Sequence, residues 1–220
     1  MYLTPGENSS VYRKRGHAVV QRILPKCDPV NKVTIISRGM ALGYTMALPQ
    51  EDRYLQSKTE FEDKIAGLLG GNVAERLIFG DTTTGASNDI EKATDLARRM
   101  VTEFGMSDKL GPLSFGKRDE LVFLGREIGE QRNYSDEVAR TIDEEVRAII
   151  DKAYERASDV LTTHRDKLVA LAEKLVAEET VDAEGFETLF TDLPPKSTDS
   201  GVPSIVGPGQ PIPEPNPQPA

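Results

Sequence analysis

The sequence predicts a mainly α-helical fold with a small β element, and three observations support this class. Apolar residues in the C-terminal half recur with the period of about 3.6 residues that marks one helix face. Good N-cap residues, among them Ser57 and Ser135, precede the longest of these segments. Strand-like composition is confined to two short stretches, 32–37 and 41–48. We therefore expect helices to dominate and to end in a C-terminal helical bundle.

The first predicted helix runs from about Ser9 to Leu24 and stops before Pro25. Its apolar residues supply one face, and helical spacing places Arg13 and His17 on the same side, one turn apart. The two predicted strands follow this helix in the chain.

The second predicted helix opens on a capping box, because Ser57 is followed three positions later by Glu60. It extends to about Ile78. Glycines interrupt its interior at Gly67, Gly70 and Gly71. Each costs about 1 kcal/mol of helix propensity relative to alanine. We expect close packing against another helix to compensate.

A third helix is predicted to start at Ser87 or Asn88, both good N-caps, and to run to about Phe104. Asp89 and Glu91 fall in its first turn, where the helix dipole favours negative charge. The helices that follow are predicted over 135–161, around 168–175 and around 186–190.

The composition fits one soluble globular domain of ordinary size, with 220 residues, 38% hydrophobic and 29% charged. A net charge of −9 argues against nucleic acid as a partner. The single cysteine, Cys27, excludes an internal disulfide framework and is interpreted as a loop or packing thiol. No apolar run approaches the roughly 18 to 20 residues that span a bilayer.

The stretch Arg13-Lys14-Arg15-Gly16-His17 looks like half of a zinc site. In the H-E-x-x-H motif of zinc proteases, two histidines one helical turn apart bind the metal and the glutamate activates a water. Here His17 and the glycine before it match that motif. Arg13 stands at the first histidine position, and Lys14 stands at the glutamate position.

Further segments follow this stretch in a fixed order. They are residues 28–39, 41–45, 48–54, 69–80, 83–90 and 105–112. In this order and spacing they closely resemble the peptidase domain of the FtsH family, the membrane-anchored AAA-type zinc metalloproteases. The resemblance runs from about Tyr12 to about Phe190. It implies a helical metallopeptidase domain that acts on unfolded or membrane proteins, uses zinc, and assembles into hexameric rings for protein quality control.

By the same resemblance, zinc is held by the two motif histidines and by an aspartate in the Ser-Asn-Asp segment. In this chain His17 and Asp89 match two of these ligands. The resemblance also implies an edge strand within 33–45 that aligns extended peptide. Glu75 is either an acid behind the site or a solvated helix residue, and His164 is structural or exposed.

The two substitutions are unfavourable for zinc chemistry. Arg13 has no lone pair to donate, and Lys14 is protonated near neutral pH, so it cannot accept a proton from water. His17 and Asp89 alone are too few ligands for tight zinc, and no catalytic residue is assigned. Arg13 or Lys14 could instead pair with Asp89. The alternatives are that His17 is an ordinary helix histidine and Asp89 an N-terminal helix charge.

The chain is divided by prediction into an unrelated leader (1–10), an FtsH-like zinc metallopeptidase domain (11–192) and a disordered Pro-rich tail (193–220). The tail could serve as a docking peptide for a proline-reading domain. No G-x-x-x-x-G-K-[ST] phosphate loop occurs, so the chain has no sequence basis for binding ATP.

Three functions remain open on the sequence alone. The first is an impaired or inactive homologue, a pseudoenzyme that assembles with itself or in a ring with intact paralogues. The second is an active zinc endopeptidase of unfolded polypeptides, completed by a substitute ligand. The third is a truncated remnant of a longer gene. The expected location is cytoplasmic, with association to a membrane through family partners as the alternative.

Overall fold

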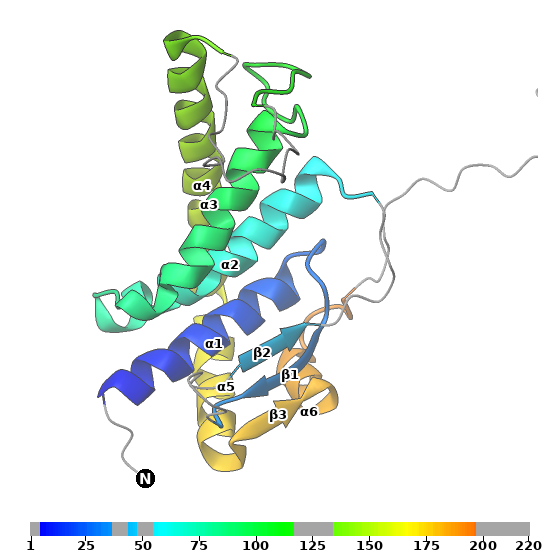
Figure 1. Ribbon diagram of the computed structural model, residues 1–220. Coiled ribbons are helices and arrows are strands. Elements are labelled where there is room, and N and C mark those ends of the chain that lie inside the picture. Colours follow the sequence, from blue (N-terminus) through cyan, green and yellow to red (C-terminus); the bar gives the residue numbers. More distant parts are fainter. Residues whose placement is uncertain (1–4, 37–43, 48–54, 117–133, 197–220) are drawn as a thin grey trace, which may run out of the picture.

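The computed structural model describes residues 5–36, 44–47, 55–116 and 134–196 (Figure 1). Within these ranges the chain forms helices and one small sheet, as the fold class predicted. The elements in chain order are α1 (Pro5–Ile23), β1 (Val30–Thr34), β2 (Tyr44–Ala47), α2 (Lys58–Phe79), η1 (Thr84–Ala86), α3 (Ser87–Thr102), α4 (Asp136–Thr163), α5 (Arg165–Glu178), β3 (Thr180–Asp182), α6 (Ala183–Glu187) and η2 (Thr188–Phe190). Two of these, η1 and η2, are single 3-10 turns.

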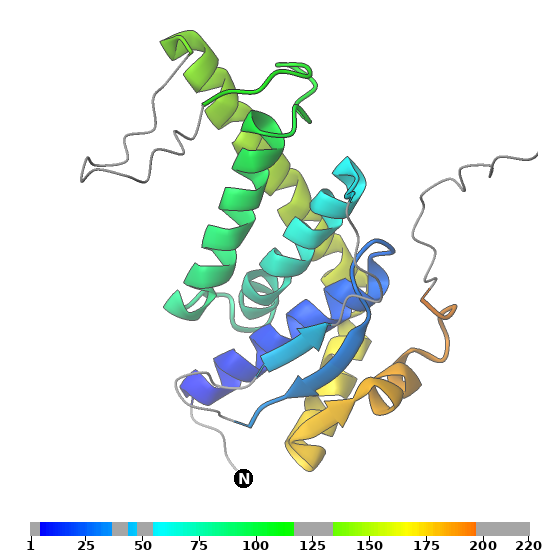
Figure 2. The same ribbon diagram turned by 45° about the vertical axis from the view of Figure 1, so that its right-hand side comes forward.

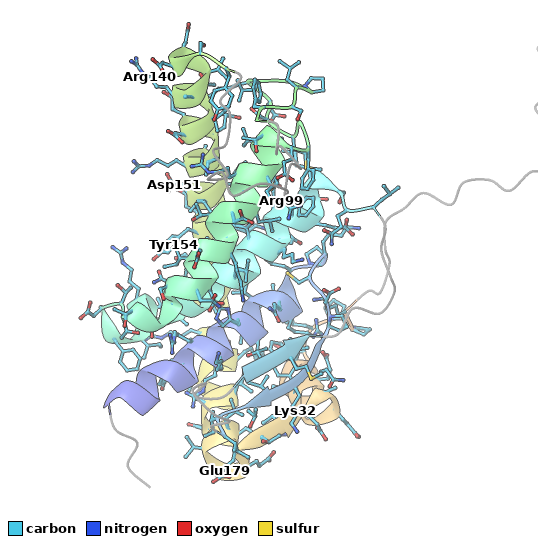
Figure 3. All side chains as sticks on the ribbon, in the orientation of Figure 1. Lys32, Arg99, Arg140, Asp151, Tyr154 and Glu179 are labelled. Carbon is cyan, nitrogen blue, oxygen red and sulfur yellow. The ribbon has the colours of Figure 1, made fainter. Side chains whose placement is uncertain are left out.

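Helix α1 crosses α2, and α3 and α4 pack on other sides of α2 (Figures 1 and 2). Helix α5 lies beside α1, and α6 packs against the small sheet. Figure 3 shows how far the molecule extends, with Arg140 near the outer end of α4 and Glu179 at the opposite end of the molecule. The C-terminal helices therefore form their bundle together with α1, α2 and α3.

The sheet has the order β2-β1-β3, and β1 pairs antiparallel with both neighbours. Val33 in the central strand faces Thr45 on one side and Val181 on the other. Strand β3 was not predicted, because three residues are too few to show an alternating pattern. Strand β1 begins two residues before its predicted stretch and ends at Thr34, and β2 falls within its predicted stretch. Residues 37–43 and 48–54 lie outside the described residues.

The crossing of α1 and α2 depends on glycine. A Cβ atom added to Gly16 would lie 2.6 Å from the Cβ of Ala74 and closer still to the carbonyl oxygen of Gly70. A Cβ atom on Gly70 would lie 2.9 Å from the carbonyl oxygen of Gly16. The expected compensation for the α2 glycines is therefore confirmed, since helix α1 packs directly on them.

The capping box of α2 is also confirmed. The Ser57 side chain accepts a hydrogen bond from the Glu60 backbone N–H, and the Glu60 carboxylate accepts one from the Ser57 N–H at 2.6 Å. Gly80 ends the helix with a φ of 69°, a left-handed conformation that suits glycine. Helix α1 begins at Pro5, earlier than the predicted Ser9.

The hydrophobic core is aliphatic for the most part and is continuous from α1 to η2. Among the described residues, no helix combines the length and the apolar content that crossing a bilayer requires.

Candidate functional site

His17 is buried where α1, α2 and α3 meet. Its Nδ1 lies 2.9 Å from the carbonyl oxygen of Gly67. A carbonyl only accepts, so Nδ1 carries the proton in this contact. Nε2 then faces the carboxylate of Asp89, with 3.2 Å between Nε2 and Oδ2. The fold thus brings together the two residues that the sequence proposed as zinc ligands.

The distance between Nε2 and Oδ2 is compatible with two kinds of contact. Ligand atoms that lie about 2.0–2.1 Å from one tetrahedral zinc are roughly 3.3 Å apart. The hydrogen bond to Gly67 would fix the ring for such a role, as outer hydrogen bonds do for metal-binding histidines. Without a metal, the same distance suits an imidazolium of His17 that donates to the carboxylate of Asp89.

The charges around Asp89 favour its ionised form. Burial works to raise the pKa of its carboxyl group, but the hydrogen bond from His17 and the positive charges of His17, Lys14 and Lys92 outweigh it, so the pKa lies below the ordinary value. Burial also lowers the pKa of Lys14; the charge of Asp89 opposes this effect, whereas Arg13 and Lys92 add to it. Lys14 therefore adds a positive charge near the aspartate, where a zinc protease has a glutamate.

The sequence left open that Arg13 pairs with Asp89, but in the structure its ion-pair partner is Glu75. The Nε of Arg13 lies 3.3 Å from Oε1 of Glu75, at an angle that makes no hydrogen bond. Glu75 is fully buried in α2 and accepts hydrogen bonds from the N–H and the hydroxyl of Thr83. The interpretation of Glu75 as a solvated helix residue was therefore wrong. Arg13 is therefore one half of a largely buried ion pair.

Two further glycines make room for these side chains. A Cβ atom on Gly71 would lie 2.8 Å from Cε1 of His17, and nearer to Nε2. A Cβ atom on Gly85 would overlap the guanidinium of Arg13, at 2.6 Å from its second terminal nitrogen. Gly71 was predicted to serve helix packing only, and Gly85 was not among the predicted site residues. The only signal was the unusual density of glycine in a helix.

A Gly71→Ala variant is expected to displace the His17 ring from Gly67 and Asp89, because the added methyl group takes the place of its Nε2 edge. The gain of about 1 kcal/mol in helix propensity partly offsets the local repacking. The chain has only two histidines, so NMR spectra of the imidazole protons can separate them. The His17 signals should shift and those of His164 should not; unchanged His17 signals would contradict the packing.

Helix α3 presents Asp89 in its first turn, as predicted. Its N-cap, however, is Ala86, and neither Ser87 nor Asn88 caps it. The reason is the preceding 3-10 turn η1, which is capped by the side chain of Thr83 and leads directly into α3.

Strand β2 lies at an edge of the described sheet and next to the site. The Thr45 hydroxyl donates a 3.0 Å hydrogen bond to the backbone carbonyl of Lys14. This contact ties the strand to the part of α1 that carries the motif.

The remaining residues singled out by the sequence are structural. His164 lies at the junction of α4 and α5, and its N–H donates to the carbonyl of Val160. The thiol of Cys27 donates to the carbonyl oxygen of Asp63, and burial raises the pKa of this thiol to about 12. A thiol with so high a pKa is a weak nucleophile at neutral pH.

The donor set does not fit a catalytic zinc ion. Such a site needs three protein ligands with lone pairs and one open position. The described part of the chain contains no group of three or more histidine, cysteine, aspartate or glutamate side chains able to hold a metal. His17 and Asp89 offer two donors, and the third position is Arg13, which has none to offer.

Comparison with known proteins gives a consistent result. The model of peptidase family M41 matches residues 3–189. Similar proteins include "ATP-dependent zinc metalloprotease FtsH 1" of Sphaerobacter thermophilus, 56% identical over 90% of this chain and 30% of that protein. "ATP-dependent zinc metalloprotease FtsH" of Bacillus subtilis is 54% identical over 83% of this chain and 29% of that protein. The chain thus spans about 30% of the length of these relatives. Its division at 1–10, 11–192 and 193–220 stays a prediction.

Proposed function

Because this chain belongs to peptidase family M41, we propose that it is a homologue of the proteolytic domain of an ATP-dependent zinc metalloprotease with an impaired hydrolytic centre, and that it acts through assembly. The observation that carries this proposal is the pairing of Arg13 with the buried Glu75. A cation held in this way stands at the position of a zinc ligand.

The chemistry of the centre supports impairment at two steps. Metal binding has only His17 and Asp89 to rely on, and Arg13 and Lys14 add positive charge that repels a divalent cation. Activation of water needs a base beside the metal, and the side chain at that position is Lys14, which has three donors and no acceptor when protonated. No other residue is proposed as the general base.

The proposed role in assembly rests on the preserved scaffold. This scaffold does not depend on a working hydrolytic centre. Helix α1 packs on α2, α3 carries Asp89, and β2 forms an edge strand. We propose self-association, or a ring shared with intact relatives, and weak binding of unfolded polypeptide as a strand added to β2. Light scattering at micromolar concentration should show a species larger than one chain; a strict monomer, alone and mixed with an intact relative, would count against assembly.

The zinc content of the purified chain tests the impaired centre. Elemental analysis should find far less than one zinc per parent chain. An Arg13→His, Lys14→Glu double variant should hold about one, because histidine at position 13 lies one helical turn from His17 on the same face. The matched control is the same variant with His17→Ala, which should lose the metal again.

Near-stoichiometric zinc in the parent chain would overturn the impaired centre. It would favour a second candidate function, a working zinc endopeptidase with a substitute ligand, for which the spacing of His17 and Asp89 is the supporting observation. Cleavage of casein by the parent chain, stopped by a chelator, would establish that function. No cleavage by the parent, with recovery of both zinc and cleavage in the double variant, would support the proposal fully.

A further inference from the structure

Arg15 is a buried cation with no counter-ion among the residues that the structure describes. Only 2% of the residue is exposed, and it is among the largest fully buried side chains of the described chain. One terminal nitrogen donates to the carbonyl oxygen of Ala172 at 3.1 Å, and Cζ lies 4.4 Å from the centre of the Tyr12 ring. Nε is buried and has no hydrogen-bond partner. No described carboxylate lies within ion-pair distance of Arg15, although the guanidinium is charged at any physiological pH.

A buried guanidinium without an acidic partner is unfavourable unless another group neutralises its charge. Burying a charge costs several kcal/mol in proteins, and one carbonyl together with the ring and hydroxyl of Tyr12 offsets only part of that cost. By contrast, the buried Glu75 is matched by Arg13, and the half-exposed Glu187 is matched by Arg22. Arg15 therefore differs from these two pairs, because none of the described acids pairs with it.

The side chain of Arg15 lines an open surface pocket, here called the cavity, between α1 and α5, two helices that contact each other; α5 passes behind α1 in Figure 1. The volume of this cavity is about 340 Å³, which is within the range of small-molecule sites. The described residues that line it are Tyr12, Arg15, Ala172, Glu173 and Val176. The cavity thus combines one buried positive charge with a mainly apolar lining.

We propose that this cavity binds a small monocarboxylate with an aliphatic body, whose carboxylate pairs with Arg15. One terminal nitrogen of Arg15 already donates to Ala172 and Nε is sealed in the interior, so the carboxylate would accept a charge-assisted hydrogen bond from the other terminal nitrogen. The aliphatic part would lie against Tyr12, Ala172 and Val176, the last of which is 51% exposed and gains burial from a ligand. Glu173 on the wall repels any anion, and it repels a dianion such as phosphate more strongly than a monocarboxylate.

This site is separate from the proposed function. It lies at the contact of α1 with α5, whereas His17 and Asp89 lie where α1 meets α2 and α3. It requires neither zinc nor hydrolysis, and a failure of the zinc experiment would leave it untouched.

The test is an NMR titration of the full chain with 4-methylpentanoate, and with 4-methylpentanamide as the neutral isostere. The acid should bind with a Kd on the order of millimolar, which is typical of so few atoms. The amide should bind at least about tenfold more weakly, because it forms no charge pair with Arg15. Inorganic phosphate should compete poorly, because of Glu173.

Two variants complete the test. Arg15→Met should reduce acid binding at least about tenfold and melt no lower than the parent, because a buried unpaired charge gives way to an apolar side chain of similar length. Arg140→Met is the matched control, because Arg140 is exposed near the outer end of α4 (Figure 3) and its loss should leave binding unchanged. Equal binding of acid and amide by the parent would overturn the proposal. So would unchanged acid binding by Arg15→Met, or no binding of the acid at tens of millimolar.

Discussion

A Gly16→Ala variant is expected to lose about 3 kcal/mol of folding free energy. The added Cβ meets the backbone of Gly70 and lies 2.6 Å from the Cβ of Ala74, so neither neighbour can rotate away. Forcing an extra carbon into a close-packed contact costs about 1–3 kcal/mol, and more where backbone must move. Alanine returns at most about 1 kcal/mol through helix propensity. Urea denaturation followed by circular dichroism would measure the change in midpoint at unchanged slope.

Gly67→Ala provides the matched control within the same helix pair. Its added Cβ would lie 3.3 Å from Cγ of Gln21 and 3.6 Å from Sγ of Cys27, both of which are side-chain atoms. The nearest of these belongs to a flexible side chain that can move by a few tenths of an ångström. This variant should therefore keep the parent's stability or gain a little. Equal losses in the two variants would show that the crossing of α1 and α2 is not as close as described.

A Glu75→Leu variant is expected to lose about 3 kcal/mol, the range found when one partner of a buried ion pair is removed. The loss has two sources. Arg13 would keep its charge in a site where only 14% of its side chain is exposed, and Thr83 would lose the acceptor for its N–H and hydroxyl. The same urea experiment would measure the loss.

A double-mutant cycle separates the ion pair from the hydrogen bonds to Thr83. Arg13→Met alone should destabilise the chain, because it leaves the Glu75 charge fully buried. The Arg13→Met, Glu75→Leu variant should be at least about 1 kcal/mol more stable than the sum of the single losses predicts. Strict additivity would mean that the two side chains do not interact, and it would contradict the ion pair of Arg13 with Glu75.

The helices were predictable because their signals are local. The apolar period, the capping box of Ser57 and the placement of Asp89 in a first turn depend on residues a few positions apart. The boundaries were less accurate where one element runs into another, as where η1 replaces the expected cap of α3. Strand β3 escaped prediction because it exists only through its pairing with β1.

The sequence by itself determined the fold class, the resemblance to a zinc protease family and the presence of Arg13 and Lys14 beside His17, because all three depend on which residue type stands at which spacing. Only the tertiary structure decided that Glu75 is buried, that it pairs with Arg13, and that Arg15 meets no acid within the described ranges. These facts depend on contacts across long stretches of chain, such as the 157 positions between Arg15 and Ala172. A local pattern cannot show which side chains meet after the chain has packed, and the energy of a charge depends on that neighbourhood.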